Sequence, residues 1–418
     1  MRRPKLACAA EAWGYGPASK LLSIARRVDG VRTAFVTGTA RTFVGLNRPS
    51  FDGVQELRSP GEILDADLDA DHLLNVMDPC AALAAARAGV PSTYVDSLSW
   101  FWRWDPEDYA ELRREAGTLL RMSRADLADY LSGADWHRMV PMAYLWSDQV
   151  FVQRMGPPDR RLKVFGHHVE PCAAIVDVTA PAAGHRTVKG LVSLSGGLSH
   201  AAQPRHARTY AEFVRALFDQ PETQAVLQGA RCHPDMLETT TGRSGMTASQ
   251  SHDELSGSLA GAPFILAPAG LTTALEAAAV RTPLGLLPEQ HGGHRANAEL
   301  LDAGRGIYPS VLVSERLGVT ADDPSRFIEE ISTSYRSILS SRPRDLSELR
   351  SAMSAMVSRL SDSSQAAELA DRQHRRVIEL TGGFDGAQSV ADAVAEALGP
   401  VRGEPIHAAS SAQSISDR

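Results

Sequence analysis

The stretch from Phe264 to Glu276 combines the residue types that hold a nucleotide. An apolar run breaks at a Pro-Ala-Gly turn, and two threonines and a glutamate follow on a segment with helical spacing. A helix that begins after such a turn presents unpaired backbone N–H groups and the positive end of its dipole, which suit a diphosphate. Glu276, one turn further on, can accept hydrogen bonds from two hydroxyls of a ribose. The residues expected at the diphosphate are Gly270, Leu271, Thr272 and Thr273.

A second polar cluster follows the next apolar run. Glu289, Gln290 and His291 come directly after "PLGLLP" and before two glycines. Ligands of open α/β sheets bind beyond the carboxyl ends of the strands, so two neighbouring loops would converge on one ligand. We expect this trio to orient a sugar. Taken alone, the stretch that ends at Glu276 is more simply explained as a capped turn with a surface glutamate, and the second cluster is what favours a binding site.

The elements that must position these residues alternate between strands and helices. In the first half "KLACAAEA", "RTAFVTG", "DHLLNVMDP" and "PSTYVDS" are typical of strands, and "ASKLLSIARRVDG" and "CAALAAARAGV" are typical of helices. This alternation indicates parallel sheets with helical crossovers. Residues 98–150 hold five of the six tryptophans among charged helical segments, and we interpret them as a helical insertion. A second alternating series begins at "VKGLVSLSGG".

The domain boundaries follow from these changes of pattern. An N-terminal Rossmann-like domain is expected over residues 1–168, a linker over 169–186, a C-terminal Rossmann-like domain over 187–375, helices that pack back toward the first domain over 376–399, and a disordered tail over 400–418. The length of 418 residues suits two domains.

Bulk composition excludes several classes of protein. The chain is 43% hydrophobic and 22% charged, with a net charge of −7, so it is expected to bind neither nucleic acid nor an anionic membrane. Its four cysteines lack the spacing of a zinc or redox motif. No apolar run approaches the ~18 residues of a membrane span, and the apolar part of the N-terminus is too short for a signal peptide. We therefore expect a cytoplasmic protein with no integral membrane association.

The segment "AGLTTALEAAAVRTPLGLLPEQHGGHRANAELLDAGRG" resembles the donor-binding half of GT-B glycosyltransferases, above all the macrolide and antibiotic enzymes and the N-acetylglucosaminyltransferase of peptidoglycan synthesis. In that family a Gly-x-x-Thr/Ser-x-x-Glu segment opens the helix that takes the diphosphate, and the residue matching Glu276 holds the ribose. An acidic residue or glutamine, here Glu289 or Gln290, holds the sugar. The resemblance implies an α/β fold of GT-B type, in which two Rossmann-like domains with parallel sheets face each other across a cleft.

The resemblance is weaker in the rest of the chain. "SLSGG" is similar to a Gly/Ser turn that faces the diphosphate, while "GYGPASKLLSIAR" is similar to the turn and helix where the acceptor approaches. The first match adds Ser195, Gly196 and Gly197 to the expected donor site. The acceptor-binding candidates are aromatic, with partly buried packing as the alternative for the tryptophans: Trp13, Tyr15, Trp100 and Trp102.

One departure from the family concerns the catalytic base. Many members carry a histidine in the first N-terminal loop, and "EAWGYGP" has none. An inverting transfer needs a base near the acceptor hydroxyl. Glu11 is the nearest candidate, and Asp78 and Asp96 follow later strands. Each of the three is alternatively a loop carboxylate or a helix N-cap, and a retaining transferase or a protein without base catalysis also stays open.

Together these features predict a glycosyltransferase that moves a sugar from a nucleoside diphosphate sugar to a small-molecule acceptor in natural-product biosynthesis. UDP and dTDP sugars are the first candidates for the donor. The resemblance implies no metal and no further cofactor, because helix dipoles and side chains neutralise the leaving diphosphate. A nucleotide-sugar hydrolase or epimerase of the same fold is the nearest alternative, and a catalytically silent GT-B-like partner protein is another. Formation of a homodimer stays open.

Overall fold

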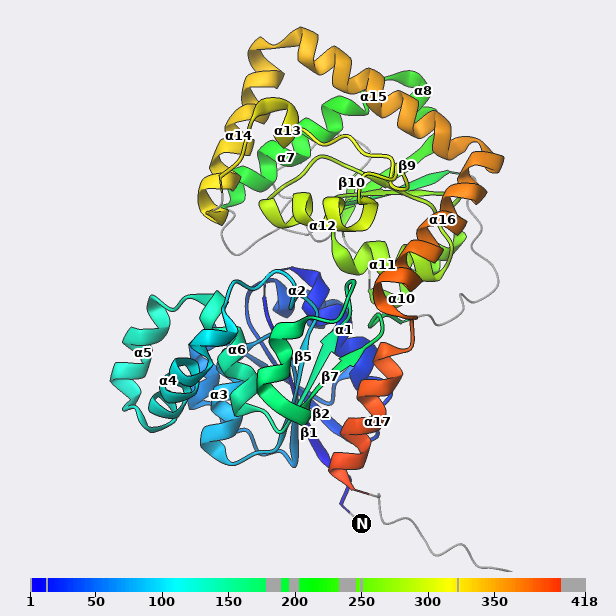
Figure 1. Cartoon of the computed structure of the whole chain (residues 1–418). Coiled ribbons are helices and arrows are strands. Elements are labelled where there is room, and N and C mark those ends of the chain that lie inside the picture. Colours follow the sequence, from blue (N-terminus) through cyan, green and yellow to red (C-terminus); the bar gives the residue numbers. More distant parts are fainter. Residues whose placement is uncertain are drawn as a thin grey trace, which may run out of the picture.

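Two parallel sheets form the cores of two lobes that lie one above the other (Figure 1). The computed structural model describes residues 2–12, 14–177, 189–194, 203–232, 246–248, 251–321 and 323–399. Among these residues no helix is both long enough and apolar enough to cross a bilayer.

The first sheet has seven strands in the order β3-β2-β1-β4-β5-β6-β7, and every neighbouring pair is parallel. Its strands are β1 (Lys5–Ala10), β2 (Val31–Val36), β3 (Gly53–Glu56), β4 (His72–Val76), β5 (Ser92–Asp96), β6 (Gln149–Gln153) and β7 (Val169–Cys172). The central strands are buried on both faces, because crossover helices cover both sides of a parallel sheet.

The helices of this lobe are α1 (Tyr15–Ala25), α2 (Gly38–Leu46), α3 (Pro79–Ala88), α4 (Tyr109–Arg121), α5 (Arg124–Ser132) and α6 (Trp136–Trp146). Short 3₁₀ turns are η1 (Arg48–Ser50), η2 (Pro60–Asp65), η3 (Pro106–Asp108) and η4 (Arg160–His168). Helices α4 to α6 make up the tryptophan-rich segment between β5 and β6, and they cluster at one side of the lower lobe in Figure 1.

The second sheet has five described strands in the order β10-β9-β8-β11-β12, again all parallel. They are β8 (Gly190–Leu194), β9 (Leu227–Cys232), β10 (Met246–Ala248), β11 (Ile265–Ala267) and β12 (Leu284–Leu286). The helices are α7 (Pro204–Leu217), α8 (Pro221–Val226), α10 (His252–Gly261), α11 (Leu271–Ala279), α12 (Gly292–Asp302), α13 (Ser314–Leu317), α14 (Pro324–Ser341), α15 (Pro343–Ser361), α16 (Ser363–Thr381) and α17 (Gly386–Leu398).

The last helix returns to the first lobe. Helix α17 contacts α1, β4 and β7, and it lies along the lower lobe, drawn red in Figure 1. Its apolar side chains Val390 and Val394 are fully buried in the same core as the central strands of the first sheet. Gly386 begins the helix at a close approach, because a Cβ there would lie 2.2 Å from the carbonyl oxygen of Ala173.

The structure differs from the expected organisation at the start of the linker. Val169–Cys172 was assigned to the linker, but it forms β7 and pairs in parallel with β6. Pro171 hides this strand in the sequence, since proline lacks the N–H of a central strand and is tolerated at an edge. Similarly, residue 376 lies inside α16, so the boundary expected there falls within a helix. The expected tail, 400–418, lies outside the described residues.

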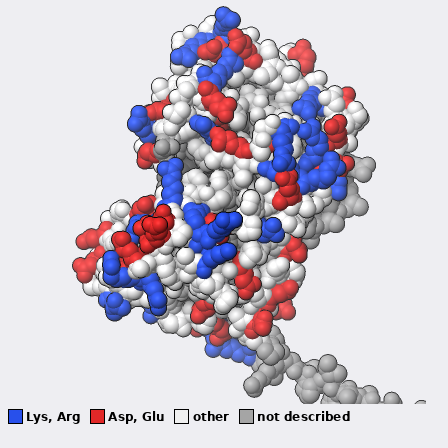
Figure 2. All heavy atoms as spheres, viewed as in Figure 1, with Lys and Arg blue, Asp and Glu red and all other residues white. Residues whose placement is uncertain are grey.

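Charged side chains do not gather by sign on the face shown in Figure 2. Lys and Arg are interspersed there with Asp and Glu over both lobes. This face therefore offers no extended field of one sign that would attract a polyanion such as nucleic acid.

Candidate functional site

A cavity lies between the two lobes, at the carboxyl ends of strands from both sheets. Its described walls come from α1, α10, α11, α12 and the ends of β4, β5, β8 and β11, and they enclose about 210 Å³. Helices α1 and α11 contact each other directly. Gly16 permits this approach, because a Cβ at that position would lie 3.0 Å from Oγ1 of Thr272.

The start of α11 faces this cavity. Strand β11 is a buried apolar run, and its end turns sharply as the N–H of Gly270 donates to the carbonyl of Pro268 at 2.6 Å. The side chain of Asn297 on α12 fixes the same turn by donating to the carbonyl of Ala269 at 2.8 Å. Gly270 is the N-cap and has no side chain, so no cap hydrogen bond covers the first turn. Four residues of the expected diphosphate site line the cavity: Gly270, Leu271, Thr272 and Thr273.

Glu276 lies in the same cavity and is bonded across the two lobes. It is 7% exposed, and its Oε1 accepts a hydrogen bond of 3.0 Å from the hydroxyl of Ser19 on α1. The Nδ1 atom of His252, at the start of α10, lies 3.5 Å from that hydroxyl and 3.9 Å from the carboxylate. The other ring nitrogen of His252, Nε2, is buried and has no hydrogen-bond partner. Three elements from two lobes thus meet at one carboxylate.

Lys20, the residue after Ser19, reaches the first turn of α11. Its ammonium donates to Oγ1 of Thr272 at 3.1 Å, although the residue is only 1% exposed. Burial lowers the pKa of Lys20 to about 8, against the opposing effects of Glu276 and Cys172. A lysine on a buried helix face is therefore part of the cavity wall.

Glu289 was expected to hold a sugar, and the structure directs it elsewhere. Its carboxylate is fully buried and accepts the backbone N–H groups of Val313 at 2.9 Å and Ser314 at 3.2 Å, together with the Ser314 hydroxyl. The hydroxyl of Tyr335 donates to its backbone carbonyl. These contacts all lie within the second lobe, and Glu289 does not line the cavity. Its side chain caps the start of α13, where the N–H groups of Val313 and Ser314 lie within hydrogen-bond distance.

The two residues that follow Glu289 differ from each other. His291 is the N-cap of α12 and lines the cavity, with its ring 3.8 Å from that of His294 between centroids. Burial and the neighbouring His291 hold the pKa of His294 well below its usual value, so His294 is neutral at pH 7. Both polar atoms of the Gln290 side chain are buried without a hydrogen-bond partner, and Gln290 is not a cavity-wall residue.

The three candidate bases occupy different environments, and none lines the cavity. Asp96 is fully engaged, since it accepts from the N–H of Leu98 at 2.7 Å, from the indole of Trp102 at 2.8 Å and from the hydroxyl of Tyr144. Burial raises the pKa of Asp96 to about 6. These bonds make Asp96 the anchor of the tryptophan-rich segment.

Asp78 and Glu11 form an interacting pair. Asp78 caps α3 through the N–H groups of Cys80 at 2.9 Å and Ala81 at 3.1 Å, and burial raises its pKa to about 6. Glu11 is 3% exposed, and burial, with the charge of Asp78 as a further cause, raises its pKa well above the usual value. Its Oε1 accepts the N–H of Ala12 at 2.7 Å, while Oε2 is buried without a partner. Of the three carboxylates, only Glu11 has a side-chain oxygen that is buried without a hydrogen-bond partner among the described residues.

The aromatic candidates for acceptor binding also occupy different environments. Tyr15, at the start of α1, lines the cavity beside Phe43, with ring centroids 5.3 Å apart. Trp102 is 2% exposed and bound to Asp96, so it is a packing residue. Trp100 is partly buried against the core of the second lobe and does not reach the cavity. Four further candidates lie outside the described residues: Trp13, Ser195, Gly196 and Gly197.

Comparisons with known proteins identify the fold. The sequence matches no protein-family model and no curated protein. The glycosyltransferase of kitacinnamycin is 14% identical with a TM-score of 0.52, over 95% of this chain and 100% of that one. The spinosyn forosaminyltransferase SpnP is 13% identical with a TM-score of 0.53, over 94% and 99%. LpCGTa, solved in complex with UDP, is 12% identical with a TM-score of 0.51, over 95% and 100%. The chain has the GT-B fold.

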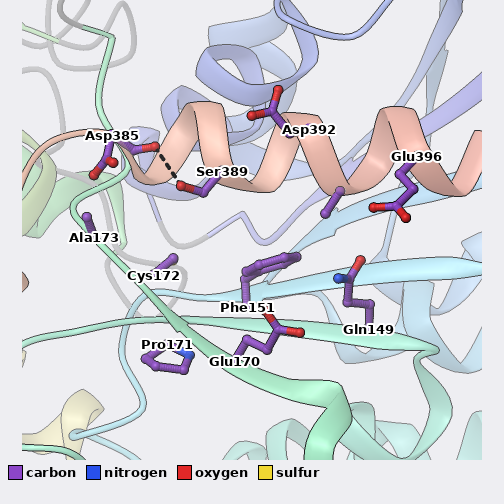
Figure 3. A pocket seen from close by; sticks show the side chains of 11 residues that line it. Gln149, Phe151, Glu170, Pro171, Cys172, Ala173, Asp385, Ser389, Asp392 and Glu396 are labelled. Carbon is purple, nitrogen blue, oxygen red and sulfur yellow. Dashed lines mark hydrogen bonds between the residues drawn. The ribbon is translucent and has the colours of Figure 1, made fainter.

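A second hollow lies on the GT-B scaffold between α17 and the edge of the first sheet. Figure 3 shows the carboxylates of Glu170, Asp385, Asp392 and Glu396 around it, and its volume is about 520 Å³. Like charges of this kind repel a diphosphate. The start of α17 also borders this hollow, but its N-cap residue is Asp385, which places a further negative charge there. The interdomain cavity is therefore the better candidate for an anionic ligand.

Several residues that line the interdomain cavity were not predicted from the sequence. Ser19 and Lys20 lie on a helix that appeared merely apolar, and His252 follows a serine in an inconspicuous segment. The scarcity of lysine, with Lys20 one of only four, was the available clue. Within the part of the chain that the structure covers, no group of three or more His, Cys, Asp or Glu side chains could hold a metal ion.

Proposed function

We propose that this protein is a glycosyltransferase that transfers a sugar from a nucleoside diphosphate sugar to a small-molecule acceptor. The observation that supports it most is that the open first turn of α11 and the carboxylate of Glu276 share one cavity between the lobes of a GT-B fold. An uncapped helix start suits a diphosphate, and a carboxylate one turn later suits the hydroxyls of a ribose.

The donor would bind along this wall. The diphosphate lies against the N–H groups of the first turn of α11, with the hydroxyls of Thr272 and Thr273 as further donors, and the ribose lies at Glu276. His291 reaches the same cavity from α12 and orients the sugar. Glu289 has no part in this contact, since its carboxylate is used at α13. UDP and dTDP are the proposed nucleotides, and LpCGTa, which shares the fold, was solved with UDP.

Transfer itself needs an activated acceptor. We assign the base to Glu11, because its Oε2 has no hydrogen-bond partner among the described residues and because Gly14 and Tyr15, which follow it closely in the chain, line the cavity. The acceptor oxygen bonds to the anomeric carbon, its proton passes to Glu11, and the bond to the diphosphate breaks with the electron pair on the phosphate oxygen. Because the pKa of Glu11 is raised, the rate should fall as the pH is lowered through that value.

The acceptor and the compartment are inferred from separate observations. Two structures with the same fold are enzymes of kitacinnamycin and spinosyn, and we propose a natural product as the acceptor, bound near Tyr15. Three cysteines, Cys8, Cys80 and Cys172, are buried free thiols, as expected for a protein of the reducing cytoplasm.

The cavity must enlarge to admit the whole donor. Pockets for drug-sized ligands are roughly 300–1,000 Å³, whereas the described walls enclose about 210 Å³. The walls are held together by bonds from α1 to α11, which join the two lobes. We propose that the lobes separate to bind the donor and close on it again.

The test is a panel of UDP, dTDP and GDP sugars, incubated with and without a set of phenolic and macrolide acceptors and followed by mass spectrometry. Release of nucleoside diphosphate together with a glycosylated acceptor is the expected result. Release that needs no acceptor would indicate a hydrolase instead. Failure to bind any nucleoside diphosphate would overturn the proposal.

Glu11→Gln examines the base within the same assay. The turnover number should fall by a factor of about 10²–10⁴, as for loss of a general base, with the donor affinity unchanged. Asp96→Asn serves as a comparison, since it alters a buried carboxylate that holds Trp102 and Tyr144. It should lower the thermal midpoint, and a specific loss of turnover there with full activity in Glu11→Gln would refute the assignment.

A further inference from the structure

We propose that Lys20, on α1 of the first lobe, binds the diphosphate of the donor at the start of α11 and neutralises its charge as it leaves. This inference rests on the proposed function. It adds to the donor site a cation from the opposite lobe.

The first observation is that Lys20 is a buried cation with no ion-pair partner in contact among the described residues, since Glu276 acts on its pKa only from beyond 4.0 Å. It is 1% exposed, and no carboxylate in the described parts of the chain lies within the 4.0 Å of an ion pair. Within the described residues, the one hydrogen bond of its ammonium is to a neutral hydroxyl, that of Thr272. Buried charges in proteins are paired or bind a ligand, because taking an unpaired charge out of water costs several kcal/mol. An anion from outside the chain would supply the missing partner.

The second observation is where the ammonium lies. The start of a helix carries roughly half a positive charge, so a cation there is repelled and an anion is attracted. Lys20 nevertheless contacts the second residue of α11. Glu276 is the single carboxylate on the described cavity wall, and its Oε1 is bonded to Ser19. The described wall thus carries one ammonium, one carboxylate and the positive end of a helix dipole, which leaves roughly half a positive charge at the helix start and favours an anion there.

The third observation is an unused polar atom on the same wall. His252 is 2% exposed and lines the cavity, and its Nε2 is buried without a hydrogen-bond partner in the described parts of the protein. A buried polar atom without a hydrogen-bond partner destabilises the folded protein unless a ligand atom bonds to it. Since Lys20 donates to Oγ1 of Thr272, the hydroxyl proton of Thr272 stays available for an acceptor in the cavity. Ammonium, hydroxyl and helix start can therefore all donate to one diphosphate.

This arrangement gives the first lobe a direct role in holding the donor. Ser19 and Lys20 are consecutive residues that bond to Glu276 and Thr272 of the other lobe. A diphosphate between Lys20 and α11 would hold the lobes together by charge as well as by hydrogen bonds. The ammonium would also stabilise the charge that develops on the departing phosphate, the kind of fixed electrostatic contact that accelerates such steps.

The test is the affinity of Lys20→Met for UDP, dTDP and GDP, each compared with its free nucleoside by isothermal titration calorimetry. Methionine keeps the length of the side chain and removes the charge. Charge-assisted hydrogen bonds lead us to expect a loss of at least about tenfold for the diphosphate that binds the unmodified protein. Affinity for the nucleoside should be unchanged. Lys163→Met, at an exposed lysine, is the matched control and should alter neither affinity.

Each outcome decides one part of the inference. Equal diphosphate affinity in Lys20→Met and the unmodified protein would overturn the role of Lys20 and leave the proposed function standing. If the unmodified protein binds none of the three diphosphates, the proposed function itself fails. If Lys20→Met loses nucleoside and diphosphate affinity alike, Lys20 supports the wall and does not bind phosphate. Lys20→Arg keeps the charge, so at least partial recovery of diphosphate affinity is expected, and a loss equal to that of methionine would also contradict the proposal.

Discussion

Two glutamates follow neighbouring strands of the second sheet, and the structure gives them opposite surroundings. Glu276, on the helix after β11, lines the interdomain cavity and is bonded to Ser19 of the other lobe. Glu289, directly after β12, is fully buried and bonded to Val313 and Ser314 of its own lobe. Position at the end of a strand is therefore not enough to make a binding residue. The hydrogen-bond donors nearest to the carboxylate decide its role.

The contrast first predicts that two matched substitutions lower the free energy of unfolding by very different amounts. Glu289→Ala would leave the N–H groups of Val313 and Ser314 and a hydroxyl buried without an acceptor, at about 1–3 kcal/mol for each group. Glu276→Ala removes one hydrogen bond beside a cavity and should cost only about 1 kcal/mol. Urea denaturation of both variants measures this difference, and equal shifts of the midpoint would remove the distinction between the two sites.

A second prediction concerns the ligand. Glu276→Gln keeps the shape of the side chain and an oxygen for Ser19, but it loses the charge that favours ribose hydroxyls. Affinity for a nucleoside diphosphate should fall by roughly tenfold or more, as for hydrogen bonds to a charged group. In a double-mutant cycle, an analogue that lacks the 3′-hydroxyl should bind the unmodified protein and Glu276→Gln with nearly the same affinity. A full additional loss for that analogue would mean that Glu276 does not contact the ribose.

The smallest effects are expected from the two serines that bond these glutamates. Ser314→Ala should lower the stability by about 1 kcal/mol and leave nucleotide affinity unchanged, because its hydroxyl serves Glu289. Ser19→Ala should leave nucleotide affinity equal or slightly higher, because the hydroxyl that competes for Glu276 is gone. Calorimetric titration of both variants checks this, and a marked loss of affinity in Ser19→Ala would show that Ser19 itself binds the donor.

The same contrast explains how far the sequence could predict the site. The alternation of apolar runs and helical segments predicted two parallel sheets, and the fold is confirmed by the sheet order and by solved GT-B structures. The turn before α11 was also recognisable, because a strand, a glycine and a helix start are local features. The bonds of Glu289 to Val313 and Ser314 could not be predicted, because these partners are 24 and 25 residues further along the chain.

Contacts between the lobes could not be predicted from local sequence patterns either. Ser19 and Lys20 meet α11 across more than 250 residues, at sequence separations of 257 and 252. In the sequence they are two polar residues on a largely apolar helix. Only the packing of α1 against α11, made possible by Gly16, turns that helix face into a wall of the cavity.

The most direct test of the central claim is a crystal structure of the protein with the nucleoside diphosphate that the titrations select. The diphosphate should lie at the first turn of α11, within about 3 Å of backbone N–H groups and of the ammonium of Lys20, with the ribose hydroxyls at Glu276. A diphosphate bound elsewhere, with Ser19 and Glu276 still joined and the cavity empty, would contradict the account.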